Sequence, residues 1–351
     1  MSKKETMKRV TFPILKTLQM DRLFRYLNRK KILILAYHGV TKRKFQIPPW
    51  TLIPIDSFER QLKFIKEKYN VITLKQAVAG ITNGNKLPGN PAVVTFDDGY
   101  KNNLTLALPI LQKYGVPATI FLTAGYIGSK EILPLDEVYL VITHSKNRNL
   151  ITISEIGLGP LLFDSEEAIL KSYYETVRVL KRFRTKDQNK YLALLKEILE
   201  SDYEKSDIVE EFRILSREEI HKLAETGLVE FGAHTVSHEI LTNISLKEAE
   251  NEIFRSKKII GEYLADDITL FAYPNGTEAD YNGEHIGCLK KNGFICSVTT
   301  VPKLNAINEN PYRLRRVNVG PDLTSILNFF ALRTSGFTND LKSFFSNGFR
   351  D

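Results

Sequence analysis

Short apolar runs, each followed by a stretch with helical spacing, recur along the chain. Seven of them stand out: "KILILAYHG", "PAVVTFDDG", "ATIFLTAGY", "LVEFGAHT", "ITLFAYP", "FICSVTT" and "RLRRVNV". Their hydrophobicity is continuous rather than alternating, which is typical of strands that are covered on both faces. The alternation of such strands with helices predicts an α/β fold, a distorted or incomplete (β/α) barrel of about seven parallel strands.

Helical segments between these runs carry recognisable end signals. We expect one helix to begin at Ser57 and another to end at Gly115. A third has Ser216 and Glu219 at the spacing of a capping box and closes at Gly227.

The alternation of strands and helices stops between about residues 133 and 212, where long charged segments with helical spacing replace it. We therefore expect a helical insertion there, within a domain that spans residues 31–335. An insertion between two strands of a barrel would lie near its mouth, where loops shape substrate binding. Residues 336–351 are expected to form a C-terminal helix or tail.

Residues 1–30 predict an N-terminal amphipathic helix, in which apolar residues such as Leu18, Leu23 and Leu27 alternate with basic ones. Such a helix can pack on the domain or lie on an anionic membrane, and both alternatives stay open. Pro13 and Lys16 interrupt the apolar stretch, so no signal peptide is expected. No run approaches the roughly 20 apolar residues of a membrane span. We expect a cytoplasmic protein, with peripheral contact at the inner face of the membrane as an alternative.

Composition narrows the function only slightly. The 351 residues are 43% hydrophobic and 26% charged, which is ordinary for a globular protein. The net charge of +8 favours anionic surroundings without fixing which. Basic residues are spread along helices rather than clustered with aromatic ones, so no nucleic acid is expected as a partner. Cys288 and Cys296 have no second pair and are expected to be structural thiols.

Two adjacent carboxylates, Asp97 and Asp98, end the second apolar run. Buried carboxylates are unfavourable unless they are paired, protonated or bound to metal. A turn with a helix cap would also explain the pair. Because Gly99 permits the chain to turn, both carboxylates can reach a site at the end of the strand, where active sites of parallel α/β folds form.

His234 and His238 are four residues apart, a spacing that would bring them to one face of a helical turn. This is a metal-ligand spacing, although histidines also satisfy hydrogen bonds in a core. A carboxylate nearby would strengthen the metal interpretation. His144, His221 and His285 are expected to face solvent.

Together, Thr95 to Gly99 (T-F-D-D-G) and the H-T-x-x-H segment of His234 resemble two motifs of the polysaccharide deacetylases of the NodB-homology type. The resemblance covers about residues 31–128 and 212–320. It implies an N-acetylated carbohydrate substrate, a divalent metal held by Asp98, His234 and His238, and Asp97 as the general base. Zinc suits these ligands best, although cobalt, nickel or manganese could occupy them.

The third motif of that family is met only in part by "FAYPNG", which contains Tyr273. Ala272 stands where an arginine that orients the base would be expected. Asn275 replaces an aromatic residue whose backbone amide supports the oxyanion, and Tyr100 is a second candidate for that amide. By strand alternation, Arg316 can supply the missing charge while Arg315 points outward.

The family's late histidine, which serves as general acid, has no counterpart after His285. The chain resembles a permuted subset, the poly-N-acetylglucosamine deacetylases, in which this residue lies near the N-terminus. His38 in "LAYHGV" would then be the acid; a histidine that satisfies a loop carbonyl is the alternative. Trp50 is a candidate platform for a sugar ring or a packed core residue.

These observations predict a metal-dependent hydrolase that removes N-acetyl groups from an amino sugar in a polysaccharide or in its lipid- or nucleotide-linked precursor. Surface polysaccharide biosynthesis is the expected setting. Two alternatives stay open. An esterase could attack O-acetyl groups with the same chemistry. A catalytically silent sugar-binding protein would explain the missing arginine and the displaced histidine.

Overall fold

The computed structural model describes residues 18–203 and 207–338. Residues 1–17 of the expected N-terminal helix and residues 339–351 of the expected C-terminal segment lie outside the described residues.

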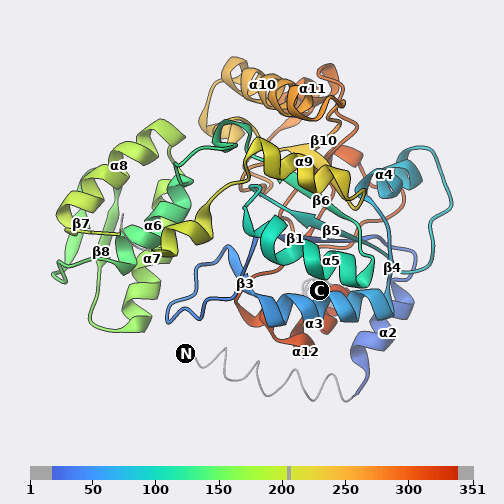
Figure 1. Cartoon of the computed structure of the whole chain (residues 1–351), viewed down its shortest axis with the longest axis horizontal. Coiled ribbons are helices and arrows are strands. Elements are labelled where there is room, and N and C mark those ends of the chain that lie inside the picture. Colours follow the sequence, from blue (N-terminus) through green and yellow to red (C-terminus); the bar gives the residue numbers. More distant parts are fainter. Residues whose placement is uncertain (1–17, 204–206, 339–351) are drawn as a thin grey trace, which may run out of the picture.

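A sheet of parallel strands forms an open half-barrel at the centre of the molecule (Figure 1). Its main path, in the order β11-β10-β9-β6-β5-β1-β12, contains a strand for each of the seven predicted runs. The strands are β1 (Leu33–Tyr37), β5 (Pro91–Phe96), β6 (Ala118–Leu122), β9 (Val229–Ala233), β10 (Leu270–Ala272), β11 (Cys296–Val298) and β12 (Val317–Asn318). The predicted α/β fold with a distorted barrel is therefore confirmed.

One further short strand extends this sheet, and two others pair outside it. β4 (Asn70–Val71) pairs with the start of β5, and β2 (Gly39–Thr41) pairs with β3 (Leu52–Pro54) in a separate ribbon. One isolated bridge, between Val298 and Leu314, links β11 to the segment before β12. The strands β2, β3 and β4 were not anticipated from the sequence.

Helices surround the sheet (Figure 1). They are α3 (Ile55–Lys68), α4 (Leu74–Thr82), α5 (Leu108–Tyr114), α9 (Arg217–Glu225), α10 (Leu246–Leu264), α11 (Gly283–Lys291) and α12 (Leu327–Thr334). The capping box of Ser216 is present, and α5 ends at Gly115 in the left-handed conformation. By contrast, α3 begins directly after Pro54 instead of at Ser57, whose side chain is buried within the helix.

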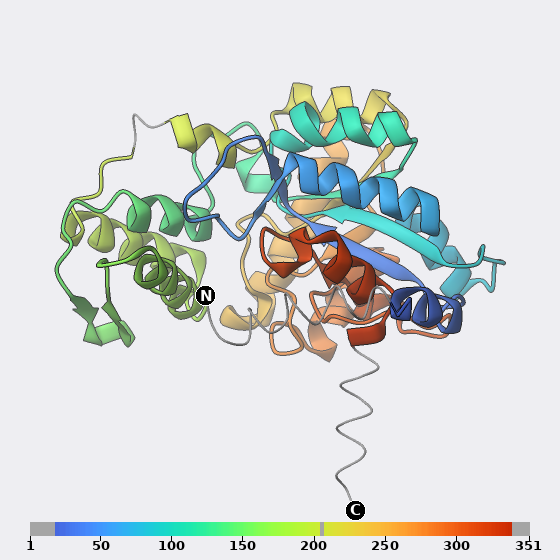
Figure 2. The same ribbon diagram turned by 90° about the horizontal axis from the view of Figure 1, so that it is seen from below.

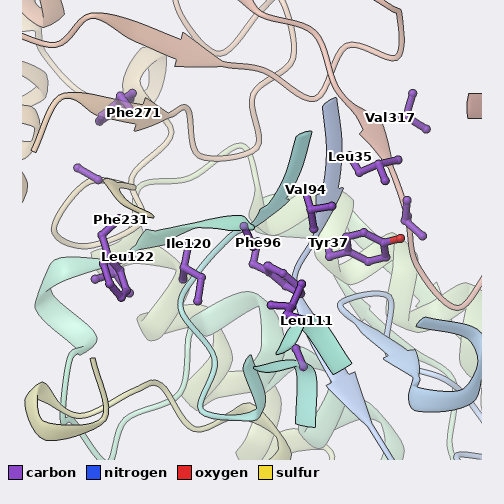
Figure 3. Close-up of a cluster of buried hydrophobic side chains, with 14 of the residues drawn as sticks. Leu35, Tyr37, Val94, Phe96, Leu111, Ile120, Leu122, Phe231, Phe271 and Val317 are labelled. Atoms are coloured by element: carbon purple, nitrogen blue, oxygen red, sulfur yellow. The ribbon is translucent and has the colours of Figure 1, made fainter. Parts of the chain in front are cut away.

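Strand alternation divides the core into two faces. Leu35, Val94, Ile120 and their neighbours at the same parity pack against the surrounding helices, including Leu111 of α5 (Figure 3). Residues of the opposite parity fill the interior of the half-barrel: Ile34, Val93, Phe121, Leu270, Ala272, Val298 and Leu314. Parity therefore decides which side chains point into the barrel.

Residues 134–203 and 207–212 lie to one side of the sheet (left in Figures 1 and 2). They form α6 (Pro134–Thr143), α7 (Glu166–Leu180), α8 (Thr185–Ile198) and the 3-10 turn Asp207–Phe212. They also contain an antiparallel hairpin, β7 (Ile151–Ile153) with β8 (Leu158–Leu161), where only helices were expected. A second apolar core, which includes Tyr139, Tyr173 and Leu195, holds this segment together.

The first described helix, α2 (Met20–Leu27), docks on the domain through one side. Phe24 packs edge-to-face on Phe337 at 5.0 Å, and Asn28 Nδ2 donates to Ser335 O. Three other apolar side chains of this helix are exposed: Leu23, Tyr26 and Leu27 are 49%, 61% and 60% exposed. Among the described residues, none of the helices is long and apolar enough to cross a membrane.

Buried polar groups away from the strand ends have structural roles. His285 was expected to face solvent, but it is 4% exposed, and its Nδ1 accepts the backbone N–H of Asn282 at the start of α11. That expectation was wrong because the residue completes a helix cap. Cys288 and Cys296 are free thiols and buried.

Candidate active site

A cavity of about 370 Å³ opens at the carboxyl ends of the barrel strands. Its wall contains six of the predicted site residues: His38, Asp97, His234, His238, Trp50 and Asn275. The first three follow β1, β5 and β9 at the parity that faces the barrel interior. Strands far apart in the sequence thus bring these groups to one edge of the sheet, where the active sites of this architecture lie.

Asp97 and Arg316 form a buried, bidentate ion pair. Arg316 Nη1 lies 2.7 Å from Asp97 Oδ1, and Nη2 lies 2.6 Å from Oδ2. Arg316 is fully buried, and its Nε donates to Thr299 O. Burial favours the neutral carboxyl, but the charge and hydrogen bonds of Arg316 outweigh it, so the pKa of Asp97 lies below its usual value. Arg315, at the other parity, pairs with Glu309 instead.

The chain turns sharply after Asp97. Asp98 and Gly99 both have positive φ, 70° and 82°. A Cβ at Gly99 would come within 2.6 Å of the Leu122 side chain, so only glycine fits there. The turn allows Asp98 to face the same site as Asp97, although neighbouring residues of a regular strand point to opposite faces.

The spacing of His234 and His238 had suggested a helical turn, but the segment that joins them is not helical. Thr235 and His238 have positive φ values of 62° and 60°. Such a conformation is unfavourable for a β-branched threonine and is typical of functional sites. Glu252 of α10 holds this segment, because its carboxylate accepts the backbone N–H groups of Val236 and Ser237 at 2.8 and 2.9 Å.

Asp98, His234 and His238 lie close enough to share one ion. Asp98 Oδ1 is 3.6 Å from His234 Nε2 and 3.3 Å from His238 Nε2, and the ligand atoms of all three lie within 4.8 Å of one another. Among the described residues, this buried oxygen has no hydrogen-bond partner. His234 Nδ1 donates to Ala272 O at 2.8 Å, which leaves Nε2 as the nitrogen that can bind a metal.

The electrostatics suit a divalent cation. Burial lowers the pKa of His234 to about 4, so its imidazole is neutral at physiological pH. Burial opposes ionisation of Asp98, but the close approach of His238 outweighs it, and the pKa of Asp98 falls well below its usual range. Two imidazoles and one carboxylate are a typical donor set of catalytic metal sites with open positions. The residues present therefore fit a metal.

His38 and Trp50 lie on another part of the cavity wall. Their rings meet edge-to-face with centroids 5.1 Å apart, and Asn103 Nδ2 donates to the His38 carbonyl. Burial lowers the pKa of His38, while the charges of Asp98 and Asp97 oppose that shift. Trp50 is half-buried, and its Nε1 has no hydrogen-bond partner among the described residues.

The two tyrosines predicted to contact substrate do not line the cavity. Tyr100 is buried, and its hydroxyl donates to Asp136 at 2.5 Å. Tyr273 faces outward from the barrel and stacks on Tyr281 with centroids 4.0 Å apart. Both side chains belong to the core. Main-chain groups of these residues stay candidates. Asn275 does line the cavity and has a φ of 58°.

Lys181 is a site residue that the sequence did not suggest. It follows α7 directly and lines the cavity, where its Nζ donates to Asn275 Oδ1 at 2.8 Å. The ammonium also lies 5.0 Å from the centroid of the Trp50 ring. No local pattern distinguishes this lysine from the many others in residues 134–212.

A family model described as polysaccharide deacetylase matches residues 84–295. YxkH of Bacillus subtilis, whose name refers to the same family, is 22% identical over 295 residues, which are 84% of this chain and 73% of that protein. The poly-beta-1,6-N-acetyl-D-glucosamine N-deacetylase of Staphylococcus aureus is 27% identical over 180 residues, which are 44% of this chain and 61% of that protein.

Solved structures share the fold. IcaB from Ammonifex degensii superposes with a TM-score of 0.57 and 19% identity, over 86% of this chain and 97% of that one. The deacetylase PplD of Streptococcus pyogenes gives a TM-score of 0.56 and 18% identity, over 86% and 96%. Likenesses at these identities concern the architecture.

Proposed function

This chain belongs to the polysaccharide deacetylase family, whose members are hydrolases that act on N-acetyl groups of polysaccharides, and on this premise we propose that it deacetylates an amino sugar in a metal-dependent reaction. The substrate would be part of a polysaccharide or of its lipid- or nucleotide-linked precursor in surface polysaccharide biosynthesis. One observation carries the proposal: the cavity brings the Arg316-paired Asp97 beside the cluster of Asp98, His234 and His238.

Asp98, His234 and His238 would hold the metal. Zinc suits two imidazoles and a carboxylate, and cobalt, nickel or manganese can take the same ligands. When bound, such an ion supplies a Lewis acid that polarises the acetamido carbonyl and makes water more acidic.

Asp97 would act as the general base. Arg316 occupies one position on each carboxylate oxygen, and each oxygen keeps a further lone pair that can accept a proton from water. Arg316 is then a positioning residue: it keeps Asp97 ionised inside the barrel and fixes the orientation of its oxygens.

His38 would act as the general acid. When water oxygen bonds to the acetamido carbon and the C–N bond breaks, the leaving amine needs a proton, which protonated His38 donates. Backbone amides near Asn275 or Tyr100 would stabilise the oxyanion that forms on the carbonyl oxygen. The products are acetate and the free amino sugar, and Trp50 can pack on a sugar ring at the cavity wall.

Peripheral contact with an anionic membrane at its cytoplasmic face belongs to the same proposal. The exposed Leu23, Tyr26 and Leu27 of α2, with Arg22 and Arg29 nearby, support it. Co-sedimentation with vesicles that contain anionic lipid should be strong for the wild type and weak for a Leu23→Glu/Leu27→Glu variant. Equal sedimentation of both would contradict the membrane contact.

The main test combines metal analysis with an acetate assay. The protein is purified without chelator, its bound metal is measured, and acetate release is followed from N-acetylglucosamine oligomers. We expect about one divalent ion per chain and activity that His234→Ala abolishes together with the metal.

Other outcomes would select the alternatives. Acetate from O-acetylated but not N-acetylated sugars would identify an esterase. Bound metal without acetate from either substrate class would favour a silent sugar-binding protein, and a protein without metal affinity would overturn the site.

A further inference from the structure

The outer wall of the cavity contains two cationic side chains that the proposed reaction does not use. Lys181 follows α7, and Arg333 belongs to α12, so two segments far apart in the sequence contribute them to the wall. Both line the same cavity as Asp97 and His234.

Lys181 is held in place without a carboxylate partner. Its Nζ donates to Asn275 Oδ1, and its ammonium lies over the Trp50 ring. Within residues 18–203 and 207–338, no carboxylate oxygen lies within 4.0 Å of this ammonium. An ammonium has three N–H donors, so two are left for a ligand.

Arg333 has fewer polar partners than Lys181. Its Nε is buried without a hydrogen-bond partner, and its guanidinium forms no ion pair with any carboxylate that the structure describes. Asp322 is the acidic residue that influences Arg333, but its Oδ1 accepts the backbone N–H and hydroxyl of Thr324. A guanidinium that is partly removed from water without partners is unfavourable unless a ligand completes its hydrogen bonds.

Carboxylates outside this wall act on Lys181 from beyond ion-pair distance: Asp280, which accepts hydrogen bonds from Asn275 Nδ2 and the Thr277 N–H, and Asp98. Asp97 is already paired with Arg316, and Asp98 faces the two histidines of the candidate metal site. The outer wall therefore presents two cations against the single carboxylate of Asp322. Such a wall favours an anionic over a neutral ligand.

We propose that Lys181 and Arg333 bind an anionic group of the substrate, so that the preferred substrate is an N-acetylated amino sugar that carries a phosphate or a carboxylate. This inference rests on the proposed deacetylase function and specifies its substrate class. The anion has two possible sources: the phosphate of a nucleotide- or lipid-linked precursor, or the carboxylate of a uronic acid within a polymer.

The test compares acetate release by kcat/KM from four probes in three arms. N-acetylglucosamine trimer is the neutral probe, N-acetylglucosamine 1-phosphate and its uridine diphosphate derivative are the phosphate arm, and a tetrasaccharide of N-acetylglucosamine and glucuronic acid is the carboxylate arm. We expect one anionic arm to exceed the neutral probe by about ten- to hundredfold, mainly through KM, because charge-assisted hydrogen bonds contribute at this level. The arm that is preferred identifies the source.

Variants assign the preference to the two side chains. In Lys181→Met, the anionic-to-neutral ratio should fall by about tenfold, and Lys181→Arg should restore most of it. Arg333→Met should have a similar effect, and thermal unfolding shows whether that variant folds. Lys186→Met on α8, an exposed lysine five residues from Lys181, is the matched control and should keep the wild-type ratio.

Calorimetric titration separates the inference from the proposed function. N-acetylglucosamine 1-phosphate should bind the wild type about tenfold more tightly than N-acetylglucosamine does, and Lys181→Met should remove the difference. Hydrolysis of neutral and anionic probes at equal kcat/KM would overturn the inference and leave the deacetylase function intact. No acetate from any probe, with no preference for the phosphate in titration, would overturn both.

Discussion

Two buried carboxylates, one in the barrel and one in the segment of residues 134–212, have opposite ionisation behaviour. Asp97 and Asp136 are each 2% exposed. Asp97 pairs with a guanidinium, whereas Asp136 accepts hydrogen bonds, from the residues that the structure describes, only from the neutral hydroxyls of Tyr100 at 2.5 Å and Thr51 at 3.1 Å. The pKa of Asp97 is lowered, while burial, followed by the nearby charge of Asp98, raises the pKa of Asp136 to about 7.

Burial alone favours the neutral acid in both places, so the partner decides the outcome. The barrel interior provides a fixed cation and keeps a carboxylate ionised, as a general base must be. The segment of residues 134–212 provides hydroxyl donors and uses its carboxyl as a structural link between α6 and Tyr100. Two carboxyl groups that are equally buried can therefore have different functions, because their partners set their protonation states.

The largest expected effect follows from Asp97→Asn. Asparagine cannot take a proton from water, so acetate release should fall by about 10²- to 10⁴-fold while bound metal stays at the wild-type level. Asp56→Asn, on the exposed first turn of α3, should keep wild-type activity. Full activity of Asp97→Asn would show that the ionised carboxylate is not the base.

Arg316→Met should produce the largest loss of stability, because it leaves Asp97 buried without its cation. We expect the free energy of unfolding to fall by about 3–5 kcal/mol, measured by urea denaturation. Arg316→Met combined with Asp97→Asn should lose less than Arg316→Met alone, since the double variant buries no unpaired charge. If the double variant is as unstable as Arg316→Met alone, the unpaired charge of Asp97 is not the cause of the lost stability.

Asp136 predicts a pH-dependent stability of the opposite sign to that of Asp97. Its raised pKa stabilises the folded state below about pH 4, and this contribution is lost as the pH rises towards 7. Between pH 5 and 8 the wild type should lose roughly 2–3 kcal/mol of unfolding free energy from this group, at about 1.4 kcal/mol per pH unit.

Asp136→Asn tests that assignment. Asparagine can still accept the hydroxyls of Tyr100 and Thr51 but does not ionise, so the variant should lose less stability over the same pH range. Parallel curves for the wild type and the variant would show that Asp136 titrates normally.

The smallest expected effect concerns a third carboxylate, Glu252, which holds the segment between the two histidines. Glu252→Ala leaves two backbone N–H groups without their acceptor and should weaken metal affinity by about tenfold, as measured by competition with a chelator. Glu262→Ala, an exposed residue on the same helix, should leave the affinity unchanged. Equal affinities in both variants would mean that the ligand geometry does not depend on Glu252.

Strand parity explains much of what could be predicted at the site. It points Arg316 inward and Arg315 outward, as the structure has them. Applied to "FAYPNG", the same rule points Ala272 inward and the Tyr273 side chain outward, which is how the structure places them. Parity is a local property of the backbone, which makes it readable without coordinates.

The amino-acid sequence by itself determined the seven main strands and the two motifs that contain Asp97, Asp98, His234 and His238, because apolar runs and short spacings are local signals. Only the tertiary structure decided that Lys181, Arg333 and Glu252 reach the cavity or its supporting segment. It also decided the non-helical turn at His238 and the neutral surroundings of Asp136. These features depend on contacts between residues far apart in the chain, and such contacts leave no periodic trace in the sequence.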